Sequence, residues 1–185
     1  MKKMMPIAPL MIEHRLLERM IALAGKEVYR IKSSGKADSD FIDTLMDFMQ
    51  TYADRCHHGK EEDILFRALK KKQLSEEHSR TIDELLADHA HGREINARLI
   101  EANKKYASGD EQSLSVITDC LSSMLNLYPP HIAKEDKEFF LPSMSYFTEE
   151  EKDSILAEEY SFDQSLIHEK YKEVVRIAED SHKER

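Results

Sequence analysis

Apolar side chains recur at helical spacing along five segments of the chain, and this pattern constrains the fold more than any other feature. In the first segment the row steps alternately by four and three residues. It runs through Leu10, His14, Leu17, Ile21, Ala24, Val28 and Ile31. Such steps bring side chains onto one face of an α-helix. No segment keeps the alternation of a β-strand, so the sequence predicts an all-α protein.

Four polar breaks separate the segments. They contain Gly35, Ser75, Gly109 and a capping-box pattern at Thr148 and Glu151, all typical of helix ends. The breaks predict helices at about residues 6–32, 40–71, 76–107, 110–141 and 148–180. Four helices of similar length with short connections form an up-down-up-down four-helix bundle, and the fifth is an additional C-terminal helix.

The length of 185 residues fits one domain. We therefore predict a single domain over residues 1–185, with a bundle core at about residues 8–142 and the extra helix at about residues 148–180.

Composition excludes several classes of partner. The net charge is -9, whereas nucleic-acid binding needs a basic face. Cys56 and Cys120 form no CxxC pattern, which fits a reduced compartment. No apolar run approaches the ~20 residues of a membrane span, and no signal-peptide cleavage site follows the first lysines. The sequence predicts a cytoplasmic protein without a nucleic-acid or membrane partner.

Histidines and glutamates interrupt the apolar rows of the bundle helices. His14 lies on the row of the first helix, and His89 shares a face with apolar residues of the third. In the fourth helix, His131 and Glu135 lie on an otherwise apolar stripe. One polar group on such a face is usually a hydrogen-bonded core residue, but a polar group on every helix needs another explanation.

The second helix offers two pairs in the stretch CHHGKEE, which are His57 with Glu61 and His58 with Glu62. Residues four apart lie one above the other on a helix. An apolar row leads into His57 and Glu61, whereas a polar row leads into His58 and Glu62. The α-helical phase therefore predicts that His57 and Glu61 face the interior and that His58 and Glu62 face solvent. A bulge in this helix would reverse the choice.

The interior thus receives four histidines and two glutamates. They are His14, His57, Glu61, His89, His131 and Glu135. Burying carboxylates without a cation costs several kcal/mol each, and imidazole with carboxylate suits Fe, Mn or Zn. The sequence predicts a pair of metal ions inside the bundle, with the glutamates as bridges.

At these residues the chain resembles the hemerythrin-like family of HHE cation-binding domains, over roughly residues 8–142. The similar motifs are EHRLLERMI with His14, HHGKEEDILF with His57 and Glu61, DHAHGREI with His89, and HIAKEDKEFFLP with His131 and Glu135. The resemblance implies two non-haem iron ions, bridged by carboxylate and oxo groups, on these six ligands. Zn or Mn could occupy the same groups.

Two positions depart from the oxygen-carrying hemerythrins. Arg93 stands where they have a second histidine on the third helix, and their fourth-helix carboxylate falls at Asp136, beside Glu135. The ligand set is therefore more similar to the iron-repair and iron-sensing members. It predicts an open coordination position or a further ligand, for which Glu18 and His168 are candidates. Tyr128 is a candidate hydrogen-bond donor to a metal-bound oxygen species.

The resemblance implies a protein that binds or reacts with small oxidants (O2, NO or peroxide), or that handles iron. An open position favours reaction with a substrate. The alternative is an oxygen or iron sensor or carrier that signals to a partner protein without catalysis. Whether the protein is an enzyme stays open, and its acidic, Met-rich helical surface could support a homodimer.

Overall fold

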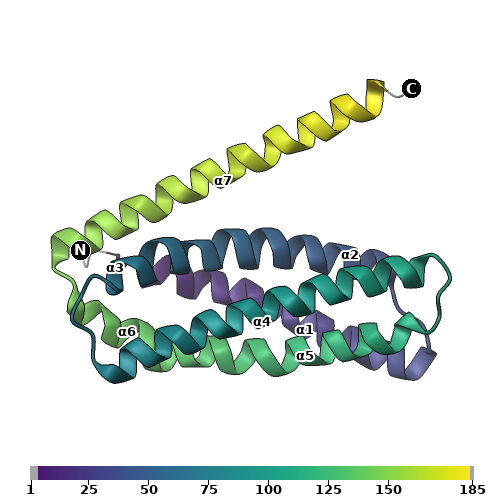
Figure 1. Cartoon of the computed structure of the whole chain (residues 1–185), viewed down its shortest axis with the longest axis horizontal. Helices are drawn as coiled ribbons and strands as arrows, with labels where there is room; N and C mark the ends of the chain where they lie inside the picture. Colours follow the sequence, from purple (N-terminus) through teal and green to yellow (C-terminus); the bar gives the residue numbers. More distant parts are fainter. Residues whose placement is uncertain (1–3, 184–185) are drawn as a thin grey trace.

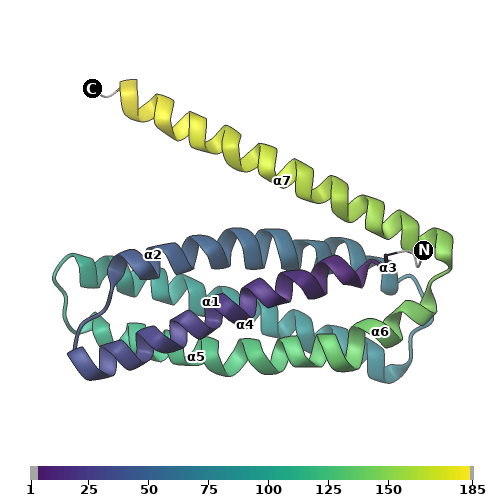
Figure 2. The same cartoon turned by 180° about the vertical axis from the view of Figure 1, so that it is seen from behind.

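The computed structural model describes the backbone of residues 4–183 and the side chains of residues 4–166. Four long helical stretches pack side by side, and successive stretches run in opposite directions (Figures 1 and 2). The first is α1 (Ile7–Ser34), and the third is α4 (Glu76–Ala107). The predicted all-α bundle is confirmed, and the alternating directions agree with an up-down-up-down arrangement.

The second and fourth stretches are composite. The second runs through α2 (Ser39–Phe48), the π-helices η1 (Met49–His58) and η2 (Glu61–Phe66), and α3 (Arg67–Leu69). The fourth runs through α5 (Ser113–Lys134), the π-helix η3 (Glu135–Phe139), α6 (Phe140–Ser143) and the 3-10 helix η4 (Met144–Tyr146). A π-turn contains more residues than an α-turn, because its hydrogen bonds span five residues instead of four. The phase of the second helix therefore departs from the α-helical phase on which the predicted orientation of His57 and His58 depends.

The helix ends carry the expected caps. The Ser75 hydroxyl accepts a hydrogen bond from the His78 amide at 3.1 Å and caps α4. Thr148 and Glu151 form the predicted capping box, with bonds of 2.9 and 3.3 Å. Gly35 ends α1 with a φ of 70°, in the left-handed region that favours glycine.

Two apolar clusters fill the bundle. The first apolar cluster includes Leu17, Ile21, Met49, Ile95, Leu99, Leu121 and Met124. The second apolar cluster includes Leu10, Ile64, Phe66, Leu85, Phe139, Phe140 and Ile155. Each bundle helix contributes to both clusters, and the interior histidines and glutamates singled out above lie where the two contributions meet. On α1, for example, His14 lies between Leu10 and Leu17. The fold therefore has a polar layer between two apolar clusters.

The additional helix is α7 (Glu149–Lys183). It begins at the end of the bundle where α3 and α6 lie and then diverges from α2 (Figures 1 and 2). Ile155 packs in the second apolar cluster, and Phe162 packs against it. The side chain of His168, a candidate ligand from the sequence, lies outside the described residues. Among the residues that the structure describes, no helix has the length and apolarity needed to cross a membrane.

Candidate metal centre

The six side chains predicted to face the interior all meet in the polar layer. They come from α1 (His14), η1 (His57), η2 (Glu61), α4 (His89), α5 (His131) and η3 (Glu135). Their exposed fractions lie between 0% and 4%. Together with one further histidine they form two groups whose nitrogen and oxygen atoms are close enough to share a metal ion.

The first group contains His14, His57, Glu61 and Glu135. The Nε2 atoms of His14 and His57 are 2.9 Å apart. His57 Nε2 lies 3.3 Å from Glu61 Oε1, and His14 Nε2 lies 3.2 Å from Glu135 Oε2. Four potential ligand atoms from three of the four helical stretches thus converge on one point.

The second group contains His58, His89 and His131. The Nε2 atoms of His89 and His131 are 3.2 Å apart. The His58 ring stacks on the His89 ring, with centroids 3.8 Å apart and planes 12° from parallel. Three neighbouring helical stretches each contribute one residue to this second group.

The expectation that His58 faces solvent was wrong, since only 4% of its surface is exposed. His57 and His58 both face the interior because they lie in the π-helix η1. With more residues per turn, neighbouring side chains are rotated less about the axis and can share a face. Glu62 differs from His58, because it is 24% exposed and bonds to His89 Nδ1 at 2.8 Å. It lies at the edge of the layer rather than in full contact with solvent.

Glu61 and Glu135 belong to the first group, and their carboxylates also reach the second group. Glu61 reaches the second group through Oε2, which is 3.4 Å from His89 Nε2. Glu135 Oε2 lies 3.3 Å from His131 Nε2. Both carboxylates are fully buried, and among the described side chains none donates a hydrogen bond to any of their four oxygen atoms. Buried carboxylates in this condition are costly unless a cation lies beside them.

The spacing of these atoms fits metal coordination. The six nitrogen–nitrogen and nitrogen–oxygen distances given above lie between 2.9 and 3.4 Å. Two donors that bind one ion at about 2.1 Å, at angles of about 90–110°, lie about 3.0–3.4 Å apart. The donor set therefore fits a pair of ions, one in each group.

The other ring nitrogen of each histidine faces a carboxylate. His14, His57 and His89 donate from Nδ1 at 2.8, 2.9 and 2.8 Å. His131 and His58 have longer contacts, of 3.2 and 3.4 Å. The acceptors, in the order of these five histidines, are Asp136, Glu13, Glu62, Asp88 and Asp54. A carboxylate at Nδ1 fixes the tautomer that leaves Nε2 free to bind a metal.

Burial determines the charge state of His57 and His58, and nearby carboxylates determine that of His14. Burial, reinforced by neighbouring imidazoles, lowers the pKa of His57 and His58 well below its usual value. Both rings are therefore neutral at pH 7, which is the form that binds metals. Burial also opposes protonation of His14, but Asp136 and Glu135 outweigh it and raise the pKa of His14 to about 9.

The two central glutamates oppose each other's ionisation. Burial raises the pKa of Glu61 well above its usual value, and the charge of Glu135 raises it further. Burial acts on Glu135 in the same direction, but His131 and His14 outweigh it and lower the pKa of Glu135. Without a cation the pair therefore favours one ionised and one protonated carboxyl group.

Two further candidates from the sequence lie outside the two groups. Glu18 is 44% exposed and pairs with Arg15 at 3.2 Å, so the structure does not bring it to the layer. The Tyr128 hydroxyl points towards α4, where a Cβ atom on Gly92 would lie 2.8 Å from it. Arg93 is 42% exposed and pairs with Asp54 and Glu62.

A buried ion cluster connects the first group to α7. Lys60 is fully buried, and its Nζ contacts Glu13 and, at 2.9 Å, Asp163 of α7. The Cys56 thiol donates to the same Asp163 at 3.3 Å. Since Glu13 also accepts from His57, a continuous line of polar contacts joins the polar layer to α7. Burial raises the pKa of the Cys56 thiol to about 12, so it is not a reactive thiolate.

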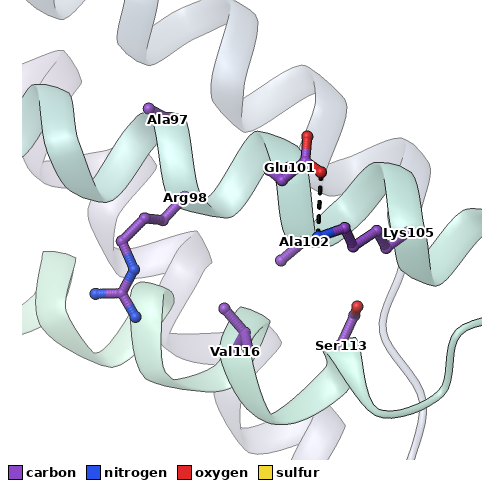
Figure 3. Close-up of a pocket in the computed structure, with 7 residues that line it drawn as sticks. All are labelled: Ala97, Arg98, Glu101, Ala102, Lys105, Ser113 and Val116. Carbon is purple, nitrogen blue, oxygen red and sulfur yellow. Dashed lines mark ion pairs between the residues drawn. The ribbon is translucent and has the colours of Figure 1, made fainter.

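A hollow of about 390 Å³ on the bundle surface is separate from this centre. It lies between α4 and α5, with Ala102 and Val116 on its floor and the Arg98 guanidinium beside it (Figure 3). None of its lining residues belongs to either group. The hollow is therefore not the entrance to the candidate metal centre.

The sequence did not identify His58 or the outer carboxylates, which are the carboxylates that accept from the histidine Nδ1 atoms. The positions of most outer carboxylates in the sequence nevertheless carry a signal. Glu13, Glu62, Asp88 and Asp136 are direct neighbours in sequence of interior residues. Each of them serves a histidine of another helical stretch, such as Glu13 with His57. Acidic residues beside interior histidines and glutamates could thus have been identified as their hydrogen-bond acceptors.

Comparison with known proteins gives one match. The model of a family described as the hemerythrin HHE cation binding domain matches residues 5–141. Searches among curated proteins and among solved structures found no match. The matched range contains every member of both groups, and it confirms the resemblance that the motifs indicated.

Proposed function

The chain belongs to the hemerythrin HHE cation-binding family, and on this basis we propose that it holds two metal ions in its polar layer. We propose iron as the native metal, with Zn or Mn as substitutes. The proposed ligands are His14, His57, Glu61, His89, His131 and Glu135. The two glutamates would bridge the ions, because each carboxylate reaches both groups.

One observation carries this proposal. The four carboxylate oxygens of Glu61 and Glu135 are buried without a hydrogen bond, and imidazole Nε2 atoms lie 3.2–3.4 Å from three of them. A purely structural bundle would gain nothing from such an arrangement, since each unpaired buried carboxylate destabilises it. Two divalent ions would compensate both carboxylates and would be bound by the imidazole Nε2 atoms that face them.

We propose that the centre binds or reacts with a small oxidant, namely O2, NO or peroxide, or handles iron itself. Bound iron would supply the redox chemistry. The chain's own residues would orient the ligands of the metal ions and shield the centre from water. The outer carboxylates hold the imidazole rings through Nδ1, and the two apolar clusters keep water away on both sides of the layer.

A sensor or carrier that signals to a partner protein is the second candidate function. The polar contacts from His57 through Glu13 and Lys60 to Asp163 favour it. They connect the proposed metal site with α7, which diverges from the bundle (Figure 1).

Anaerobic titration of the metal-free protein with Fe(II), followed by air, tests the proposal. Two irons per chain and new near-ultraviolet and visible absorption in air are expected. Spectra that reverse when oxygen is removed would favour a carrier or sensor, and irreversible oxidation would favour catalysis. Binding of less than one metal per chain, without any gain in stability, would refute the metal site.

We further propose a cytoplasmic protein that folds as a single domain over residues 1–185. Ile12, Leu16 and Leu23 are exposed on one face of α1, and they support a homodimer through this helix. Sedimentation of the wild-type protein and of a Leu16→Glu variant would test the dimer.

A further inference from the structure

His58 lies where it can supply a third imidazole to the second group. Its ligand atom and those of His89 and His131 lie within 4.8 Å of one another, and all three side chains are buried. His58 Nδ1 faces Asp54, so Nε2 is the nitrogen that is free for a metal. Without His58 each group has two imidazoles, and His58 gives the second group a third.

The backbone explains how two adjacent histidines reach one interior. The amide of Gly59 donates to the carbonyl of Asp54, five residues earlier, as in a π-helix. The wider turn carries His58 onto the interior face beside His57. The hydrogen bonds of a π-turn have a less favourable geometry than those of an α-helix. π-Turns nevertheless occur frequently at functional sites.

Arg93 occupies the position at which the third helix could have supplied another ligand. Its guanidinium faces outwards and donates from Nε to Asp54 at 2.7 Å, so it holds the carboxylate that faces His58. Arg93 also pairs with Glu62, the acceptor of His89. The arginine therefore supports two imidazoles of the second group from outside the polar layer.

We propose that His58 is a metal ligand, so that the second ion is bound by His58, His89 and His131 in addition to the two glutamates. This inference rests on the proposed metal function. It gives the chain five histidine ligands, with the fifth supplied by the second helix through the π-turn. The competing interpretation makes His58 a packing residue that stacks on His89 and touches no metal.

A count of ligated imidazoles in the wild-type protein decides between these interpretations. Co(II) would be titrated into the metal-free protein, and proton NMR would count the strongly shifted, exchangeable Nδ1–H signals. Five signals are expected if His58 binds metal, because each of the five rings faces a carboxylate at Nδ1. Four signals at two bound cobalt ions would overturn the assignment of His58 alone. No bound cobalt in any form would instead refute the proposed function.

Two variants provide an independent measurement. His58→Gln should keep one tight Co(II) site and weaken the second by about 100-fold or more, whereas His91→Gln should bind both ions like the wild type. His91 is a matched control, because its imidazole is 58% exposed and lies on α4 away from the layer. Equal affinity of His58→Gln and the wild type for both ions would overturn the inference. If His58→Gln does not fold, the signal count on the wild-type protein still decides.

Discussion

Replacing Lys60 with methionine tests how the protein compensates its buried charges. The Lys60 side chain is fully buried and lies between Glu13 and Asp163, which are 13% and 33% exposed. Methionine has a similar length and volume, so the change removes the charge without leaving a large cavity. What remains is a pair of carboxylates that face each other in a poorly hydrated space.

The loss of unfolding free energy in Lys60→Met depends on how exposed the two carboxylates are. Removal of one partner of a buried ion pair costs about 3–5 kcal/mol. Because Asp163 is one-third exposed, water compensates part of its charge, and we expect the lower end, about 3 kcal/mol. For a chain of this length each kcal/mol lowers Tm by about 2–4 °C, which gives a loss of about 6–12 °C.

Urea unfolding of the metal-free proteins at pH 7 measures this loss. Lys71→Met is the control, because Lys71 is exposed, and a change within about 0.5 kcal/mol is expected there. Adding Asp163→Asn to Lys60→Met should restore part of the stability, since one of the unpaired charges is then absent. If Lys60→Met loses less than about 1 kcal/mol of unfolding free energy and does not differ from Lys71→Met, Lys60 does not neutralise this cluster.

Three further changes probe other contacts. Gly92→Ala should lower the free energy of unfolding by about 1–3 kcal/mol in thermal unfolding, because its Cβ would lie 2.8 Å from the Tyr128 hydroxyl. Gly25→Ala is the control and should not destabilise the protein, because its Cβ would meet nothing closer than 3.4 Å. Burial, only partly offset by a lysine, raises the pKa of Glu159 to about 8. The stability of the wild type should therefore fall by up to about 5 kcal/mol between pH 4.5 and 8, and Glu159→Gln should lose this pH dependence. Arg93→Gln should weaken the second metal position about 10-fold in calorimetric titration and leave the first unchanged, since the arginine supports only the carboxylates of the second group.

The helices could be predicted because their signals are local. The Ser75 cap and the capping box at Thr148 and Glu151 each act within three residues, and the apolar rows need only the α-helical period. The six interior side chains that the structure brings together could be identified for the same reason. Each of them interrupts an apolar row on its own helix.

His58 could not be placed in this way, because its orientation depends on the backbone hydrogen bond from Gly59 to Asp54. No local preference of the residues around it marks a π-turn. The outer carboxylates are a different case, since Glu13 and Asp88 act across helices, on His57 and His131. Their roles depend on which helices become neighbours, and this is a property of the bundle as a whole.

If metal ions offset the energetic cost of the buried glutamates, Glu61→Gln should change Tm in opposite directions without and with metal. In the metal-free protein, burial and the charge of Glu135 raise the pKa of Glu61 well above its usual value and keep this carboxyl group neutral, so a neutral glutamine should leave Tm equal or raise it. With metal at about 100 times its Kd, each bound ion should stabilise the wild type by about 2.7 kcal/mol, and the variant should lose this gain because it lacks the bridge between the groups. Thermal unfolding of both proteins with Fe(II) under anaerobic conditions, and with a chelator, provides the comparison. A residue that merely packs would shift Tm by the same amount in both conditions. Only a ligand makes the variant the more stable protein without metal and the less stable one with it.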